Sequence, residues 1–206
     1  MKCRENIIEQ FKNQPYFTRE AFFQISKECN VKDTTVRSYL VRSLARKDII
    51  QLKRGFYVTT DFYNKNKNDI SYIFYLANVL RGPSYVSSWT ALQYYNLTTE
   101  IINTITSVSE KVTRDYITKI STFSYHSINE KLFSDFILVK EKFEFFIATP
   151  SKALFDLIYF RTKQLRGIKL EEIDSIVESL RIDIEEMDKE EKNKFYKLVK
   201  EYIKNE

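Results

Sequence analysis

The sequence predicts an α+β fold, with an N-terminal winged helix-turn-helix domain followed by a mixed α/β domain that ends in amphipathic helices. Three observations lead to this prediction. Apolar residues recur every four positions after Asp33, which is the spacing of one helical face. Two short β-rich runs then flank a glycine-containing turn at residues 53–55. Further β-leaning runs between residues 104 and 148 precede two stretches with helical periodicity.

The composition excludes several classes of protein. The chain has 206 residues, of which 43% are hydrophobic and 30% are charged, so one large or two small globular domains are expected. No apolar run is long enough to span a membrane, and charges interrupt the apolar N-terminus, so it is not a signal peptide. Cys3 and Cys29 have no metal-ligand spacing. We expect no disulfide framework and a cytoplasmic location.

The helix expected after residue 33 has two different faces. Asp33 is a candidate N-cap, because its carboxylate can accept a hydrogen bond from a first-turn N–H group. Val36, Leu40 and Leu44 form one apolar stripe at four-residue spacing. The opposite face carries Thr34, Arg37, Ser38 and Arg42. Before this helix, residues 4–12 and the residues after Thr18 are expected to form two shorter helices.

A basic hairpin is expected next. Residues 49–52 and 56–59 are the two strands, and Gly55 can adopt a positive φ in the turn between them. Lys53 and Arg54 would then stand at the hairpin tip. Residues 1–60 hold 12 Lys/Arg and 6 Asp/Glu, a net charge of +6, whereas residues 168–206 have a net charge of −4.

These features favour binding of double-stranded DNA, with the helix after residue 33 in the major groove and the hairpin near phosphates. A basic amphipathic helix that is merely solvated remains the alternative. The candidate DNA-binding residues are Thr34, Thr35, Arg37, Ser38, Arg42, Lys53 and Arg54.

The predicted domains are residues 1–60, a polar linker at residues 61–69, and residues 70–206. In the second domain, Thr149 can cap a helix that starts at Pro150 and ends at Gly167. The other expected elements are a helix at 70–80, a strand at 84–86, a helix at 88–95, strands at 104–108, 116–120 and 122–125, a hairpin of residues 136–139 and 143–148, and two amphipathic helices after residue 168.

No arrangement of residues predicts catalysis. His126 is the only histidine and is expected to be a surface or packed residue. Glu190-Glu191-Lys192 lies in a charged helix and is interpreted as a solvated face. Lys152, Asp156, Tyr159 and Lys163 share one side of the Pro150 helix, where they form either a contact surface or a solvated face. We therefore expect no enzyme activity, no cofactor and no metal.

The order of several motifs adds a family resemblance. The chain contains FTRE, TVRSYLVRSLARKDIIQLKRGFY, YLANVLRGPSYVSSWTALQYYNL, ITSVSEKVTRDY, TFSYHSI and ATPSKALFDLIYFR in this order. Over residues 17–166 this succession resembles the AbiEi antitoxins of abortive-infection, type IV toxin–antitoxin systems. The chain departs from that family at Pro150-Ser151-Lys152-Ala153, where Pro-Glu-Lys-Ala is usual, and at Lys47-Asp48, where a glycine is usual.

The resemblance implies a phage-defence antitoxin that represses its own operon. Its N-terminal domain would bind inverted repeats in its own promoter, as a monomer or weak dimer that pairs on DNA. Its C-terminal domain would neutralise a cognate nucleotidyltransferase-like toxin, with or without a stable complex. The alternative from the residues is a winged-helix transcriptional regulator whose C-terminal domain senses a small ligand, as its many aromatic residues suggest. A nuclease or transferase ranks third.

Overall fold

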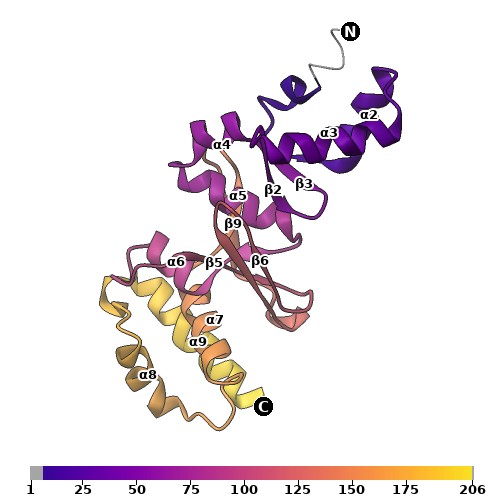
Figure 1. The fold of residues 1–206 in the computed structure, drawn as a ribbon. Coiled ribbons are helices and arrows are strands. Elements are labelled where there is room, and N and C mark those ends of the chain that lie inside the picture. The colour runs from indigo at the N-terminus through magenta and orange to yellow at the C-terminus, as the bar shows by residue number, and fades with distance from the viewer. Residues whose placement is uncertain (1–6, 206) are drawn as a thin grey trace. The chain divides into compact units, whose positions relative to one another are not determined.

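The structure is a computed structural model that describes residues 7–205 (Figure 1). It is a mixed α+β protein, as the sequence predicts. The chain divides into two compact units. Unit 1 comprises Met1–Ile73 and Tyr116–Ser121, and unit 2 comprises Phe74–Asp115 and Thr122–Glu206. Within the described part of the chain, no helix is long and apolar enough to cross a membrane.

Unit 1 combines helices with a small antiparallel sheet. Its elements are the 3-10 helix η1 (Ile8–Phe11), β1 (Phe17–Thr18), α2 (Arg19–Glu28), α3 (Asp33–Ala45), β2 (Ile49–Lys53), β3 (Phe56–Thr59) and α4 (Thr60–Asn66). The strand order is β1-β3-β2, and both pairings are antiparallel. The core buries Phe11, Phe17, Phe22, Val36 and Leu40, because these apolar side chains lie on the inner faces of the helices and strands.

The starts of the helices in unit 1 follow local hydrogen bonding. The Thr18 hydroxyl accepts a hydrogen bond from the Ala21 N–H group at 3.2 Å, so Thr18 caps α2. The expectation for Asp33 is wrong, because Lys32 is the N-cap of α3 and Asp33 is its first residue. The first helix is confirmed only as η1, and residues 4–6 of its predicted range lie outside the described residues.

The stretch expected as a linker, residues 61–69, includes most of helix α4. The Thr59 hydroxyl accepts a hydrogen bond from the Phe62 N–H group, and the buried Asn66 amide donates to the Phe62 carbonyl at 2.8 Å. Asp69 then accepts hydrogen bonds from Ser71 at the start of α5 (Ile70–Leu80). These local bonds give the polar sequence a helical structure. The predicted division into domains stays a prediction.

Unit 2 is built on most of a six-stranded sheet with the order β6-β7-β5-β4-β9-β8. The strands are β4 (Tyr85–Val86), β5 (Thr104–Ser109), β6 (Arg114–Ile117), β7 (Thr122–Ser127), β8 (Phe136–Val139) and β9 (Phe145–Ala148). β5 pairs with β7 in parallel, and β8 pairs with β9 antiparallel. The predicted hairpin is therefore confirmed, whereas β6 begins two residues before the predicted strand.

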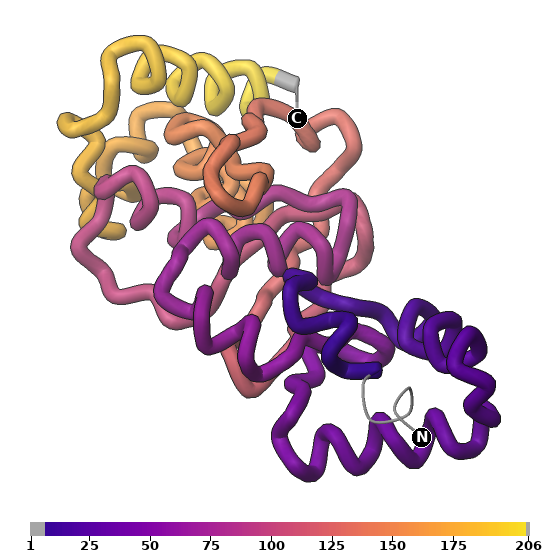
Figure 2. Tube along the Cα trace, turned by 90° about the horizontal axis from the view of Figure 1, so that it is seen from above, coloured from indigo at the N-terminus to yellow at the C-terminus, as the bar shows by residue number. Residues whose placement is uncertain are grey.

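Besides the part of α5 from Phe74 onward, the helices of unit 2 are α6 (Ser88–Tyr94), α7 (Pro150–Arg161), α8 (Ile173–Ser179) and α9 (Lys189–Asn205), with 3-10 turns η2 (Glu130–Leu132), η3 (Leu170–Glu172) and η4 (Ile184–Glu186). Both views place α7 beside α9 (Figures 1 and 2). α7 also packs against α6. Every residue from Ser151 to Tyr159 is buried, so α7 is the central helix of unit 2.

The ends of α7 agree only partly with the bounds predicted from the sequence. Thr149 is the N-cap, and its hydroxyl accepts a hydrogen bond from the Lys152 N–H group, as predicted. The helix ends at Arg161, not at Gly167. Residues 163–165 then have positive φ values of 51°, 69° and 59°, which are left-handed conformations that cannot continue an α-helix.

Candidate interaction surfaces

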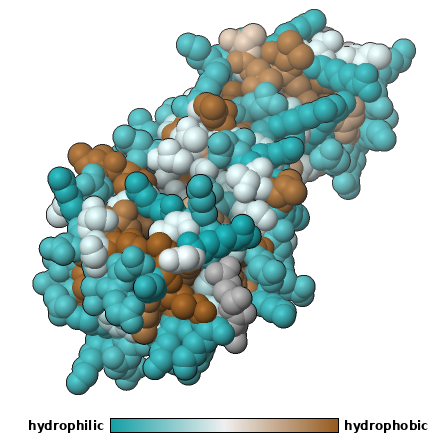
Figure 3. Space-filling model, turned by 90° about the horizontal axis from the view of Figure 1, so that it is seen from below, coloured by the Kyte–Doolittle hydropathy of each residue, from teal (hydrophilic) through white to brown (hydrophobic). Residues whose placement is uncertain are grey.

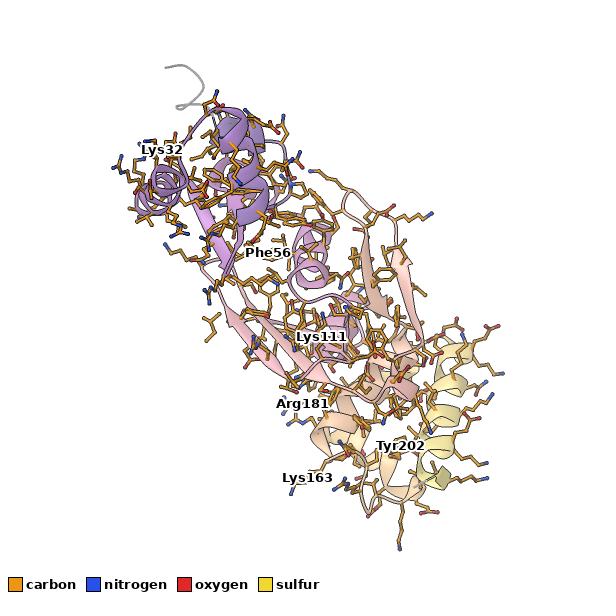
Figure 4. All side chains as sticks on the ribbon, turned by 90° about the vertical axis from the view of Figure 1, so that its right-hand side faces the viewer. Lys32, Phe56, Lys111, Lys163, Arg181 and Tyr202 are labelled. Carbon is orange, nitrogen blue, oxygen red and sulfur yellow. The ribbon has the colours of Figure 1, made fainter. Side chains whose placement is uncertain are left out.

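The outer face of α3 carries five of the predicted site residues. Thr34, Thr35, Arg37, Ser38 and Arg42 are all exposed, and the Ser38 hydroxyl donates to the Thr34 carbonyl. The apolar stripe is also confirmed, since Val36 and Leu40 are buried and Leu44 packs against the same core. In Figure 4, Lys32 marks the start of this helix.

The structure brings Arg37 and Arg54 together, but not the other predicted site residues. Both arginines line a hollow of about 370 Å³ between α3 and the hairpin, together with Leu40, Val41 and Leu44. Val41 is an apolar side chain with 66% of its surface exposed. This hollow therefore has an apolar lining next to the guanidinium groups of Arg19, Arg37 and Arg54 and the carboxylate of Glu20.

Lys53 stands next to the two-residue turn of the hairpin, where it pairs with Phe56. It is the last residue of β2, and its Nζ lies 4.0 Å from the centre of the Phe56 ring and 5.7 Å from that of Tyr116. This cation–π arrangement holds the ammonium group against aromatic rings. Gly55, in the turn, has the predicted positive φ of 84°.

A buried ion pair lies in the middle of α7. Lys152 Nζ is 2.8 Å from Asp156 Oδ1, and the two residues are 1% and 0% exposed. Within the described residues, Oδ1 has no hydrogen-bond donor besides this ammonium group. Asp156 Oδ2 accepts hydrogen bonds from the hydroxyl groups of Tyr85 at 3.0 Å and Ser87 at 2.7 Å. This network joins α7 to β4 and to the residue that precedes α6.

Burial controls the protonation of this network. It raises the pKa of Asp156, whereas the Lys152 ammonium group and the hydrogen bonds from Ser87 and Tyr85 lower it. Burial and the Asp156 carboxylate also raise the pKa of Tyr85, so the Tyr85 hydroxyl keeps its proton and donates it. All the hydrogen-bond and ion-pair partners of Asp156 thus lie inside the core of unit 2.

The solvated-face interpretation of the Pro150 helix is therefore wrong for three of its four residues. Lys152, Asp156 and Tyr159 are buried, and only Lys163, beyond the end of α7, is exposed. Helical spacing correctly placed them on one side, but it does not reveal which side faces the core. Lys152 reaches the Leu132 carbonyl with a hydrogen bond of 2.7 Å and so ties η2 to α7.

Next to this pair lies a hollow of about 1160 Å³ in unit 2, which the sequence did not predict. Its walls come from η2 and the residues before it, from α7 and the turn after it, and from α9. Lys163 and Tyr202, which contribute from the turn and from α9, are labelled in Figure 4. We call it the basic hollow, because its exposed cations are Lys131, Lys163 and Arg166 and its one exposed carboxylate is Glu201.

Three other side chains with charged or titratable groups have structural contacts. His126 is half-buried and stacks on Phe160 with ring centres 4.8 Å apart, so it is a packed residue as expected. Arg161 lies 5.9 Å from the centre of the Trp89 ring. Glu191 is not simply solvated, because its Oε2 accepts hydrogen bonds from the Ser151 N–H and hydroxyl groups at the start of α7.

The β8–β9 hairpin exposes an apolar surface. β8 is an edge strand, and Ile137, Leu138 and Phe146 are 48%, 41% and 41% exposed. Leu138 pairs with Phe146 across the two strands, so both side chains lie on the same face of the sheet. Hydrophobic side chains also gather in patches between hydrophilic ones on the face of the molecule in Figure 3. Open strand edges of this kind are templates for pairing with another chain.

The remaining chemistry of the described residues is limited. They contain no group of three or more His, Cys, Asp or Glu side chains that could hold a metal ion. Cys29 is disulfide-bonded, whereas a disulfide framework is not expected from the sequence. The expectation for Cys3 lies outside the described residues. Spacing in the sequence carried no information about this bond, because it depends on tertiary proximity. The cytoplasmic location stays a prediction.

Part of the chain is similar to a known protein family. The model of the CSN8/PSMD8/EIF3K family matches residues 30–149, which is more than half of the chain. The matched residues run from the end of α2 to the N-cap of α7 and include β2 to β9. No curated protein matches the chain.

This match overturns the AbiEi resemblance and what it implied. The antitoxin, the operon repressor and the alternative transcriptional regulator are wrong as functions, and promoter DNA and a nucleotidyltransferase-like toxin are wrong as partners. Two physical reasons account for the error. A helix with an exposed basic face suits any anionic surface and does not specify DNA. Short sequence motifs that form turns and helix caps recur in proteins of different families, because each needs the same local structure.

Proposed function

Since the chain belongs to the CSN8/PSMD8/EIF3K family, we propose that it is a non-catalytic subunit of a multiprotein assembly and that it binds other protein subunits. The family match over residues 30–149 is the observation that carries this proposal.

The side chains that could perform chemistry support a binding role. Asp156 is fully buried and has Lys152, Tyr85 and Ser87 as partners. His126 is packed against an aromatic ring, and neither residue is placed to activate a nucleophile for a substrate. We therefore propose that the protein has no enzymatic activity of its own.

We also propose that α2, α3 and the β2–β3 hairpin form a winged helix-turn-helix. The order of these elements, the shared core and the sheet order β1-β3-β2 support this assignment. In this proposal the exposed face of α3 contacts a neighbouring protein. The contact residues would be those first selected from the sequence, namely Thr34, Thr35, Arg37, Ser38, Arg42, Lys53 and Arg54.

The edge of β8 is the surface of unit 2 that we assign to a partner subunit. A strand of the partner would pair with the open edge, and its apolar side chains would cover Leu138 and Phe146. Covering such a surface removes apolar area from water, which contributes roughly 25 cal/mol per Å² before the costs of association. A partner strand is the natural occupant, because it also satisfies the backbone groups along the edge.

The test is the size of the particle that contains the chain. A tagged full-length chain, expressed in its own cells at its natural level, should elute in an assembly much heavier than its own 24.7 kDa, and cross-links should connect β8 to one defined subunit. Leu138→Glu should release the chain from this assembly. Val112→Glu, which changes an even more exposed apolar residue elsewhere in unit 2, should not. A wild-type chain that elutes only at 24.7 kDa contradicts the proposal.

A further inference from the structure

The basic hollow of unit 2 combines two kinds of lining. Aromatic side chains of α7 and α9 form one part, and basic and polar side chains form the other. Its full lining includes Phe155, Tyr159, Phe160 and Tyr202 on the aromatic side, and Lys131, Lys163, Gln164 and Arg166 on the polar side. A ligand that fits must therefore offer both apolar surface and hydrogen-bond acceptors.

The charge of the hollow favours an anionic ligand. Within the described residues, none of Lys131, Lys163 and Arg166 forms an ion pair, and all three are exposed. Glu201 lies 3.8 Å from Lys197, which offsets part of its negative charge. The buried Lys152–Asp156 pair adds no net charge when both are ionised. Three cations facing one partly compensated carboxylate leave a positive potential.

The aromatic side of the hollow is held in place. Phe155 and Tyr159 are 1% and 4% exposed, and their ring centres lie 5.8 Å and 5.5 Å from that of Tyr202. Tyr202 and Phe160 are half-buried, so their rings are the apolar surface that a ligand can reach. Rings fixed by mutual packing lose little freedom on binding, which favours affinity.

The polar side is also held in place before binding. Lys152 Nζ fixes the Leu132 carbonyl, which sets the position of the wall that carries Lys131. In the turn after α7, Gln164 donates its N–H group to the Tyr159 carbonyl at 2.7 Å, and Leu165 is 1% exposed. Lys163 and Arg166 therefore lie in this turn on either side of the buried Leu165 side chain, which anchors it.

We propose that the basic hollow binds an acidic segment of a partner subunit, in which carboxylates flank one aromatic side chain. The aromatic side chain packs against Phe160 and Tyr202, and the carboxylates meet Lys131, Lys163 and Arg166. This inference rests on the proposed role as a subunit of an assembly. The volume of about 1160 Å³ exceeds the range of roughly 300–1,000 Å³ typical of small-molecule pockets, which favours a chain segment.

Fluorescence anisotropy of the full-length chain with labelled synthetic peptides tests the proposal. The probe peptide has glutamates on both sides of one phenylalanine. One comparison peptide has glutamines in place of the glutamates, and another has serine in place of the phenylalanine. We expect binding of the probe alone, weakening as salt is added, because exposed charges are screened.

Charge-reversal variants locate the binding site. Lys163→Glu with Arg166→Glu should weaken binding of the probe at least about tenfold, because two favourable contacts become repulsive. Lys189→Glu with Lys200→Glu makes the same change of charge on exposed residues of α9 that do not line the hollow, and should change binding little. Equal loss in both double variants would indicate a non-specific effect of net charge and would overturn the proposal.

Three other outcomes would overturn the proposal that the hollow binds an acidic segment. These are no binding of the probe, equal binding of all three peptides, and displacement of the probe by a single-stranded RNA oligonucleotide at lower concentration. The proposed function is judged separately by the size of the assembly. If the probe fails to bind while Leu138→Glu still releases the chain, the hollow is not the docking site but the role as a subunit stands.

Discussion

At the scale of single residues, Lys152 and Asp156 show how a helix can bury two charges. They are four residues apart, so their side chains meet on one face of α7. Taking both from water costs several kcal/mol, and the ion pair offsets this only when further hydrogen bonds satisfy the remaining groups. Tyr85, Ser87 and the Leu132 carbonyl supply those bonds.

Removing one partner should therefore cost more than removing both. We expect Lys152→Met to reduce the free energy of unfolding by about 3–5 kcal/mol, because it leaves Asp156 buried without its cation. Lys152→Met combined with Asp156→Asn should cost less than the sum of the two single changes. Urea unfolding of the wild type, the two single variants and the double variant measures this coupling. Additive losses would mean that the two side chains do not interact in solution.

His126 should make stability depend on pH. Burial lowers its pKa, while the charges of Asp115 and Asp156 act in the opposite direction. Because its pKa is lower in the folded chain than in the unfolded chain, stability falls as the pH drops from about 6.5 through the folded pKa. His126→Phe should reduce the loss of stability between about pH 7 and pH 5 in urea unfolding. Since His126 is the only histidine in the sequence, an unchanged loss of stability in this variant would mean that carboxylates cause the pH dependence.

At the scale of elements, local signals predicted the structure where neighbouring residues decide it. The Thr18 and Thr149 caps, the β8–β9 hairpin and the stripe of Val36 and Leu40 all depend on residues close together in the sequence. The end of α7 was predicted too late. The sequence predicts the end of the helix at Gly167, but the left-handed residues 163–165 end it earlier, and nothing in their side chains signals this conformation.

The candidate surfaces were harder to predict, because they are assembled from distant segments. The basic hollow joins η2, α7 and α9, which are separated by long stretches of chain. Lys163 was selected from the sequence, whereas Lys131 and Arg166 carry no local signal that distinguishes them from other exposed cations. Arg37 and Arg54 are expected from the sequence as two separate contacts, whereas in the structure they line one hollow. The cation–π contact of Lys53 with Tyr116 is non-local, so the sequence does not predict it.

At the scale of the whole molecule, the net charge of long segments differs from the local charge of the surfaces that they help to form. Residues 1–60 have a net charge of +6 and residues 168–206 one of −4. The basic hollow nevertheless lies in unit 2, because Lys131, Lys163 and Arg166 precede the acidic stretch. Averages over long segments therefore hide the local fields that select a partner.

The last prediction concerns where the native chain is cleaved. Lys65 and Lys67 are exposed, but Lys65 belongs to α4, which is held by the Thr59 cap and the buried Asn66 amide. Lys169 is exposed in the segment between α7 and η3, beyond the turn that Leu165 anchors. A protease needs a locally unfolded segment, so trypsin should cut after Lys169 before it cuts after Lys65 or Lys67. Mass spectrometry of the first products identifies the sites. Asn66→Gly, which removes the amide bond and weakens the helix, should expose Lys65 and Lys67 to cleavage and shows that trypsin can use them. First products from the wild-type chain that end at Lys65 or Lys67 would instead mean that residues 61–69 act as an open linker, as the polar sequence alone predicts.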